Sequence, residues 1–453
     1  MTRPGSRRAV NAGRRSRARR ICDLPDPVTP SRIRIRAPRR DEGPFRIIRT
    51  MPTSFERAFA LLQRRFPHLN LPGPFVEFIR AQEETGHILR RVSTGESLLE
   101  FLARLEAPAH TLDRLFTPES RLRPRLDYAA LLRLTPDALF AYLLDQFAAV
   151  FDLQQLALDS ETVTGFNAHG SPHVSNVARN ALALARGFDP LSANSTLEKE
   201  AVIGGLMHDM GNLLGRKLHG LYGVYLMTQL FTNVEADPAT LDSFVTALEV
   251  TLFHEVEFGS EQALFARLNP ATLAVIIADK TDVSFRRVSA KSNVSEAMRD
   301  AHVLVNLLVA ASAISRDAGP EGRFNWRVDF RSKFDLEHFD LFSSLLKATG
   351  RVRYPQEWTA LYEESNIEYL FVFQSTFLTI YLSRLYLTLR AVFSMFPSVS
   401  EFVFVVDDAE RSVSLTRVFN RSTYRQQIQT LGKLFYRENW PNTVLFHAVG
   451  RDL

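Results

Sequence analysis

Residues 201–213 read AVIGGLMHDMGNL and decide the fold of the central part of the chain. The apolar run predicts a buried helix, and the pair His208-Asp209 follows directly at its end. Upstream, residues 195–198 (STLE) have the spacing of a capping box, which marks the start of this helix. Two polar side chains at the end of a buried helix, where the chain is expected to turn at Gly211, indicate a functional site.

Imidazoles and carboxylates flank this pair at helix-length intervals. Of the 11 His in the chain, five fall between residues 169 and 254. Neutral imidazole nitrogen and carboxylate oxygen together suit divalent Mn, Fe, Mg, Zn, Co or Ni ions, and the absence of cysteines other than Cys22 excludes a site built from thiolates. The residues expected to hold one or two such ions are His173, His208, Asp209, Asp279, His219 and His254.

Each of these ligands is expected near a helix end. Ser171-Pro172 predicts an N-cap followed by proline at the first helical position, so that His173 lies in the first turn. There the helix dipole keeps the ring neutral, as a ligand must be. Further helices are predicted over residues 217–230, from Asp237-Pro238 to near His254, and from Asn269-Pro270 to Asp279. Gly223 would let a neighbouring helix approach closely.

The ordered series of His173, His208-Asp209 and Asp279 resembles the HD-domain superfamily of metal-dependent phosphohydrolases. The stretches AHGSPHVSNVARNAL, AVIGGLMHDMGNL, KLHGLYG, LFHEVEFG and IIADKTDVSFRRV are similar to blocks in a subgroup of HD-type phosphatases and phosphodiesterases. The similarity covers roughly residues 160–290. It implies a mainly α HD-type helical bundle that cleaves a phosphomonoester or phosphodiester through a metal-bound hydroxide.

The resemblance also suggests roles for the residues around the ligands. Glu255 or an unbound histidine would move a proton, and His169 would coordinate the ion, orient His173 or contact the substrate. Lys280 and Asp282 flank the last ligand, and with Arg286 and Arg287 they either clamp a phosphate or are exposed helix charges. We therefore expect Glu255, Lys280 and Asp282 to be the catalytic residues.

The chain departs from the superfamily pattern at several positions. Asn176 stands where an arginine is common, Asn212 replaces the lysine that follows HDxG in many cyclic-dinucleotide phosphodiesterases, and Phe253 replaces the first histidine of their His-His pair. A cyclic-dinucleotide substrate is therefore poorly supported. The alternative class of protein is a non-catalytic HD-type module that senses a nucleotide and passes a signal to the C-terminal domain.

Length and composition describe the remainder. A chain of 453 residues that is 45% hydrophobic can form more than one domain. A single cysteine excludes an intrachain disulfide and favours a reducing, cytoplasmic compartment. The apolar run at residues 301–314 is too short to span a bilayer, and the one at 371–396 contains Gln374, Arg384 and Arg390, so no membrane association is expected.

Residues 1–50 differ in composition from the rest. They hold 15 Arg, no Lys and four acidic residues, a net charge of +11, so residues 51–453 carry 5 − 11 = −6. Such a segment is expected to be a disordered tail that contributes nothing to the fold. Nucleic-acid binding through this tail is a third, weaker interpretation, and a natural start at Met51 is an alternative reason for its composition.

The remaining segments complete the predicted organisation. Residues 51–155 are predicted to form a helical region. One apolar face holds Phe55, Phe59, Leu62 and Phe66, and a second apolar run follows at Leu98, Phe101, Leu102 and Leu105. This region is expected to pack on the metal-binding domain (156–318) or to make a homodimer surface.

Residues 319–453 are predicted to form an α/β module. A helix is predicted over 296–316, a strand over 324–330 and a helix over 336–346. A strand (367–373), helix (376–396), strands (401–406 and 412–419), helix (424–438) and strand (443–449) follow in ferredoxin-like order.

Overall fold

The computed structural model describes residues 54–77, 126–161, 168–188, 195–254, 267–288, 301–316, 322–330, 370, 373–374, 377–378, 380–409 and 411–436. The chain divides into two units, Met1–Met51 and Pro52–Leu453, and every described residue belongs to the second. The expectations for the arginine-rich tail, for the second apolar run at 98–105, for the helix at 336–346, for the strand at 443–449 and for Glu255 lie outside the described residues.

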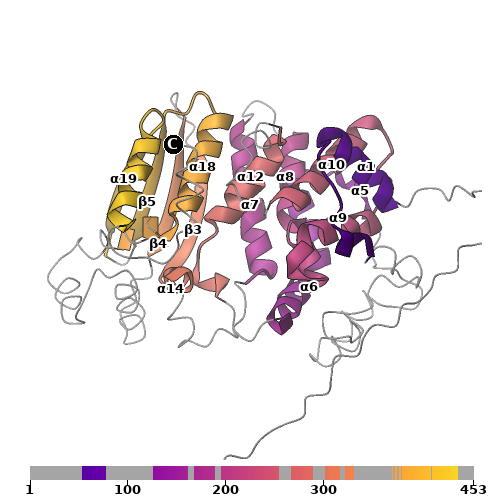
Figure 1. Cartoon of the computed structure of the whole chain (residues 1–453), viewed down its shortest axis with the longest axis horizontal. Coiled ribbons are helices and arrows are strands. Elements are labelled where there is room, and N and C mark those ends of the chain that lie inside the picture. The colour runs from indigo at the N-terminus through magenta and orange to yellow at the C-terminus, as the bar shows by residue number, and fades with distance from the viewer. Residues whose placement is uncertain are drawn as a thin grey trace, which may run out of the picture. The chain divides into compact units, whose positions relative to one another are not determined.

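The described residues are mostly helical, with a small C-terminal sheet (Figure 1). The α-helices are α1 (Ser54–Arg65), α5 (Tyr128–Leu131), α6 (Pro136–Glu161), α7 (Ser171–Phe188), α8 (Thr196–Met207), α9 (His219–Leu230), α10 (Pro238–Phe253), α12 (Pro270–Thr281), α14 (Ala301–Leu307), α18 (Leu382–Met395) and α19 (Tyr424–Tyr436). Short 3-10 helices are η1 (Met210–Leu213), η2 (Arg216–Leu218) and η3 (Phe285–Arg287). The strands are β1 (Leu126–Asp127), β2 (Phe231–Thr232), β3 (Val309–Arg316), β4 (Arg323–Phe330), β5 (Glu401–Asp408) and β6 (Val413–Asn420).

Three helices of the central bundle, α8, α10 and α12, begin at the predicted caps. The Ser195 hydroxyl accepts a hydrogen bond from the backbone N–H of Glu198, which starts α8. The side chains of Asp237 and Asn269 accept comparable bonds at the starts of α10 and α12, and proline takes the first helical position in both. These starts are confirmed, and each fixes where the polar residues at the far end of its helix emerge.

Close helix contacts bring those far ends together. A Cβ at Gly211 would lie 1.7 Å from the carbonyl oxygen of His219, so only glycine lets η1 pack directly on the start of α9. A Cβ at Gly223 would lie 2.4 Å from Cγ2 of Thr251, which confirms the predicted close approach of a neighbouring helix, here α10. In Figure 1, α7, α8 and α12 run beside one another, and their apolar faces share buried residues such as Val177, Ala201 and Ala274.

The N-terminal region packs on this bundle. Phe55, Phe59, Leu62 and Phe66 are all buried, which confirms the predicted apolar face of α1. The Phe55 and Tyr225 rings lie 6.0 Å apart between centroids, and the Arg65 guanidinium donates to a carboxylate oxygen of Glu249 at 3.1 Å. Helix α1 is therefore fixed to α9 and α10 by apolar and charged contacts.

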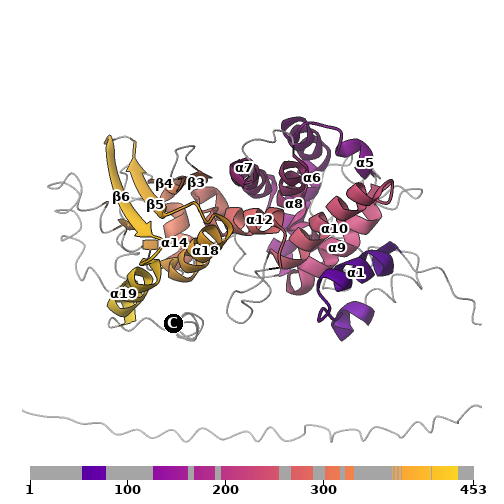
Figure 2. The same cartoon turned by 90° about the horizontal axis from the view of Figure 1, so that it is seen from above.

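The C-terminal sheet has the strand order β3-β4-β5-β6. The outer pairs, β3 with β4 and β5 with β6, are antiparallel, and the central pair of β4 with β5 is parallel. One face buries Phe324, Trp326 and Phe404 against the segment that leads into α18, and α19 lies along the same face (Figure 2). Within the described residues, no helix is both long enough and apolar enough to cross a membrane.

Two predicted elements of this region are wrong. The helix expected over 296–316 ends at Leu307, and residues 309–316 form β3, so the sheet begins before residue 319. A continuous apolar run has little hydrophobic periodicity, so the sequence does not distinguish a helix from a strand here. Pairing of residues 309–316 with β4 then outweighs their helix propensity. The strand expected over 367–373 is helical at its described positions, because Leu370, Phe373 and Phe377 form a fully buried stripe at helical spacing. The ferredoxin-like order is therefore not confirmed; the strands before α18 are β3 and β4.

Candidate metal centre

The predicted ligands lie at the ends of five helices that meet at one level of the bundle. His173 is in the first turn of α7 and His219 is the first residue of α9. His208 is the C-cap of α8, with Asp209 next to it, and His254 is the C-cap of α10. Asp279 lies in the last turn of α12. Two of these helices begin at the cluster and three end there, which brings together residues more than a hundred positions apart in the sequence.

One half of the cluster is formed by His173, His208 and Asp279. The Nε2 atoms of the two imidazoles are 3.2 Å apart. Oδ1 of Asp279 lies 3.5 Å from Nε2 of His173 and 4.0 Å from Nε2 of His208. Oδ2 of Asp209 completes this half at 3.4 Å and 3.2 Å from the same two nitrogens. Such a group of buried nitrogen and oxygen atoms could hold a metal ion.

The other half is formed by His219 and His254 with the second oxygen of the same aspartate. Their Nε2 atoms are 3.0 Å apart. Oδ1 of Asp209 lies 3.5 Å from Nε2 of His219 and 3.4 Å from Nε2 of His254. Asp209 thus presents one oxygen to each pair of imidazoles.

The hydrogen bonds of the opposite ring nitrogens decide which tautomers these histidines adopt. Nδ1 of His208, His219 and His254 each lies 2.8 Å from a backbone carbonyl, of Gly205, Arg216 and Thr251 respectively. A carbonyl only accepts, so Nδ1 carries a hydrogen in each ring, and in the neutral ring Nε2 then carries a lone pair. Two lone pairs facing each other at about 3 Å repel, and a cation between them removes that repulsion.

The electrostatics of the cluster also favour a positive charge within it. Burial opposes ionisation of Asp209 and Asp279, yet neighbouring imidazoles, and Lys280 beside Asp279, hold the pKa of each carboxyl well below its usual value. Burial lowers the pKa of His254 to about 4, which leaves its ring neutral. The carboxylates of Asp209 and Asp279 outweigh burial at His208 and raise its pKa. The two buried carboxylates therefore favour a positive charge in the cluster, which a proton on His208 or a bound metal ion would supply.

Two further residues orient the ligands. Nδ1 of His173 donates to Oδ2 of Asp282 at 2.6 Å, which turns Nε2 of His173 toward the cluster. Asp282 was expected to be catalytic, but the structure places its buried carboxylate against His173, Asn176 and Arg287. Burial lowers the pKa of His169 to about 3, so its neutral Nδ1–H donates to Oδ2 of Asp209 at 2.6 Å. This contact gives His169 an orienting role toward Asp209, and His169 also belongs, with His173 and Asp209, to a group that could hold a metal ion.

Of the basic residues predicted to clamp a phosphate, only Lys280 and Arg287 lie near the cluster. Nζ of Lys280 lies 2.8 Å from Oδ2 of Asp279, and this lysine side chain is 22% exposed, so it borders the cluster. Arg287 is buried, and its Nη1 lies 3.7 Å from Oδ2 of Asp282. Arg286 is exposed and stacks over Phe285, with 5.8 Å between its guanidinium carbon and the ring centroid. Arg286 therefore fits the interpretation as a surface charge.

Sequence reasoning missed Asn212 and Arg216 as members of the cluster. Nδ2 of Asn212 donates to Oδ1 of Asp209 at 3.0 Å. Nη1 of Arg216 lies 3.2 Å from Nε2 of His219 and 3.9 Å from Oδ1 of Asp209. The sequence feature that could have indicated their membership is the spacing of Asn212 and Arg216, which are four residues apart. Between them the chain turns at Gly215, whose φ is 144°.

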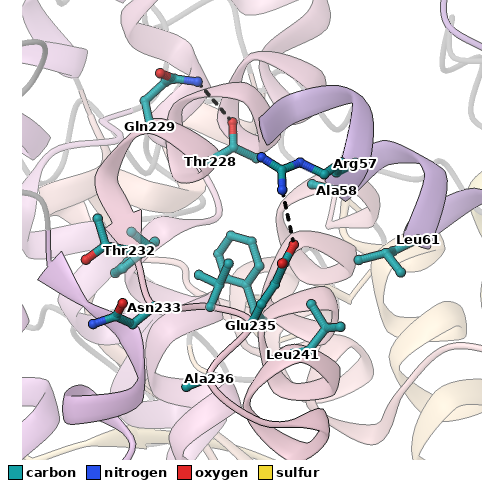
Figure 3. Close-up of a pocket in the computed structure, with 13 residues that line it drawn as sticks. Arg57, Ala58, Leu61, Thr228, Gln229, Thr232, Asn233, Glu235, Ala236 and Leu241 are labelled. Carbon is teal, nitrogen blue, oxygen red and sulfur yellow. Dashed lines mark hydrogen bonds and ion pairs between the residues drawn. The ribbon is translucent and has the colours of Figure 1, made fainter. Parts of the chain in front are cut away.

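A separate pocket of about 460 Å³ lies between α1, the end of α9 and the start of α10 (Figure 3). Arg57 and Glu235 approach each other across it, with 4.0 Å between Nη1 and Oε1. None of the candidate metal ligands lines this pocket. We therefore place the candidate centre in the histidine and aspartate cluster and assign no ligand to the pocket.

Comparison with known proteins gives no relative from which a role could be transferred. No family model matches the chain, and no curated protein or solved structure matches it either. The functional interpretation therefore depends on the motif and on the geometry of the cluster.

Proposed function

We propose that the chain is a metal-dependent phosphohydrolase whose bundle is of the HD type. The observation that carries this proposal is the pairing of four imidazoles around the two oxygens of Asp209. When its rings are neutral, each pair turns two Nε2 lone pairs toward each other, an arrangement that neighbouring cations stabilise. The order of His173, His208-Asp209 and Asp279 in the sequence supports the same class of enzyme.

Two ions fit the donor set better than one. His173, His208 and Asp279, with one oxygen of Asp209, would hold the first ion. His219 and His254, with the other oxygen of Asp209, would hold the second. Imidazole and carboxylate donors without thiolate favour Mn, Fe, Zn, Co or Ni over a site built for calcium.

The residues of the cluster have separate tasks in phosphoester hydrolysis. When bound, the ions would act as Lewis acids and lower the pKa of a water molecule at the site. Asp282 and His169 hold His173 and Asp209 in position through their short hydrogen bonds. Lys280 places a positive charge at the partly exposed edge of the cluster, where a phosphate would enter. Glu255 remains a candidate for moving the proton, from outside the described residues.

The experiment is a screen of phosphomonoesters, phosphodiesters, nucleotides and cyclic dinucleotides with Mn, Mg, Co, Ni or Zn added to the purified chain. We expect metal-dependent turnover of at least one monoester or diester and little turnover of cyclic dinucleotides. Asp209→Asn removes one charge with little change of shape and should abolish that turnover. Asp137→Asn, at an exposed carboxylate on α6, is the matched control and should retain it.

The competing class of protein is the non-catalytic module that senses a nucleotide. Ion binding without turnover of any ester, together with saturable binding of a nucleotide, would replace our proposal with that one. Turnover that persists in Asp209→Asn would place the chemistry elsewhere in the chain and contradict the proposal directly.

A further inference from the structure

Arg216 is the one guanidinium of the described residues that reaches the imidazole pair formed by His219 and His254. It follows the turn at Gly215 and begins η2, three residues before His219. Its side chain is 31% exposed, whereas those of Asp209, His219 and His254 are at most 2% exposed. Arg216 therefore lies between solvent and this half of the cluster.

Arg216 contacts both ring nitrogens of His219, one through its backbone carbonyl and the other through its guanidinium. The backbone carbonyl of Arg216 accepts a hydrogen bond from Nδ1 of His219 at 2.8 Å, so the lone pair of the ring is on Nε2. A guanidinium cannot accept a hydrogen bond, so Nη1 of Arg216 donates to that Nε2 at 3.2 Å. The same Nη1 donates to Oδ1 of Asn212 at 3.4 Å and faces Oδ1 of Asp209 at 3.9 Å.

A metal ion and Arg216 therefore compete for one lone pair. A divalent ion that binds His219 takes the lone pair of Nε2 and repels the guanidinium at the same time. The arginine then lacks its imidazole acceptor while it still lies beside an ion that attracts anions. A phosphate oxygen at that ion would accept the released N–H in a charge-assisted hydrogen bond.

We propose that Arg216 is a phosphate-binding residue of the site, in addition to Lys280, and that His219 holds its guanidinium until a metal ion takes the lone pair of the imidazole. The proposal rests on the ion site of the proposed function and goes beyond it in two respects. It assigns phosphate recognition to a residue outside the HD motif, and it requires ions to bind before phosphate.

The two consequences of removing Arg216 have opposite signs. Arg216→Met deletes the competitor for His219, so the second ion should bind several-fold more tightly. The same variant deletes a charged donor to the phosphate, so phosphate should bind roughly 10- to 100-fold more weakly. A residue that only stabilised the fold would weaken both kinds of binding or neither.

The test uses the full chain and two ligands, Mn²⁺ and inorganic phosphate. Mn²⁺ binding is followed by the electron paramagnetic resonance signal of the free ion, and phosphate binding by titration calorimetry on the Mn-loaded protein. Lys217→Met is the matched control, because it removes the adjacent, exposed positive charge. Arg216→Lys keeps the charge without the planar fork and should retain part of the phosphate affinity.

We expect Arg216→Met to show the opposite changes in the two affinities, Lys217→Met to resemble the wild type, and phosphate to bind the ion-free protein far more weakly than the loaded one. Wild-type phosphate affinity in Arg216→Met, or loss of the second ion in that variant, would overturn the proposal. Phosphate binding does not need turnover. A wild type that binds ions and phosphate through Arg216 but cleaves no ester would contradict the proposed function alone, and a wild type without ions would contradict both.

Discussion

Nδ1 of His173 and Oδ2 of Asp282 form a 2.6 Å hydrogen bond that joins the start of α7 to the end of α12. The carboxylate makes no direct contact with the other candidate ligands in the part of the chain that the structure describes. It accepts a hydrogen bond from Nδ1–H, so the lone pair of the neutral His173 ring is on Nε2, which faces Asp209 and Asp279. The geometry of the candidate metal centre therefore depends on a residue outside the set of candidate ligands.

Asp282→Asn should lower the affinity for the first ion by roughly 10- to 100-fold, as is typical when the partner of a ligating histidine is changed. The amide keeps the shape of the side chain but loses the negative charge that favours the Nδ1–H tautomer. Titration with Mn²⁺ measures the effect, with Asp137→Asn as the surface control. Unchanged Mn²⁺ affinity in Asp282→Asn would show that His173 needs no such partner.

Gly211→Ala should destabilise the protein by several kcal/mol, because the new Cβ would lie 1.7 Å from the carbonyl oxygen of His219 and 2.5 Å from the backbone nitrogen of Gly223. Backbone atoms cannot rotate away, so α9 must shift and carry His219 with it. Gly73→Ala is the matched control, since its Cβ would meet nothing within 4 Å. Urea unfolding compares the two; equal stabilities would contradict the close packing of η1 on α9.

Glu200 should make stability depend on pH. Burial raises the pKa of its carboxyl from 4.5 to about 8, although a hydrogen bond with Ser243 opposes the shift. Between these values the unfolded chain is ionised while the folded protein keeps the proton, so the free energy of unfolding falls as pH rises, by up to about 1.4 kcal/mol per pH unit. This contribution is fully present below pH 4.5 and lost as pH rises through about 8.

Glu200→Gln removes the titrating proton and should flatten this part of the curve, so that the variant is more stable than the wild type at pH 8. Chemical denaturation at several pH values measures both curves. The exposed Glu235→Gln variant controls for the loss of a surface charge. If the free energy of unfolding of the wild type and of Glu200→Gln changed with pH by the same amount between pH 5 and pH 8, the assignment to Glu200 would be contradicted.

The sheet and the helices of the candidate metal centre should unfold together. The Ser312 hydroxyl on β3 donates to the carbonyl oxygen of Thr281, the last residue of α12, and accepts from Nε1 of Trp326 at 2.9 Å. Ser312→Ala leaves a buried donor and acceptor without this partner, at a cost of about 1–3 kcal/mol. Ser315→Ala, on the exposed face of the same strand, should cost little. Denaturation followed by tryptophan fluorescence and by metal release should give one transition in every variant, and two separate transitions would contradict the coupling.

Local sequence signals were sufficient for the starts of α8, α10 and α12. The caps at Ser195, Asp237 and Asn269 act on residues only two or three positions away, so the sequence specifies the helix starts directly. Since helix lengths follow from apolar periodicity, the positions of His208 and His254 at helix ends could be predicted as well. The ordered motif then indicated which of the helix ends meet.

Other features depend on contacts between distant residues. The orienting role of Asp282 requires a bond across 109 positions, and nothing near Asp282 in the sequence indicates it. Arg216 joins the cluster through the fold of a turn rather than through a motif. Residues 309–316 form a strand because β4 pairs with them, whereas their own composition suits a helix equally well. The sequence alone therefore did not predict the pairing of β3 with β4, nor that the side chains of Asp282 and Arg216 contact the cluster.

The number of ions bound per chain, and their magnetic coupling, tests most directly whether Asp209 would hold an ion with each of its oxygens. Elemental analysis and electron paramagnetic resonance of the Mn-loaded wild type should give two ions per chain with a spin-coupled spectrum, because both ions would share this carboxylate. Asp209→Asn should lose the coupled spectrum and at least one ion. Absence of bound metal in the wild type, or two coupled ions that persist in Asp209→Asn, would contradict the account.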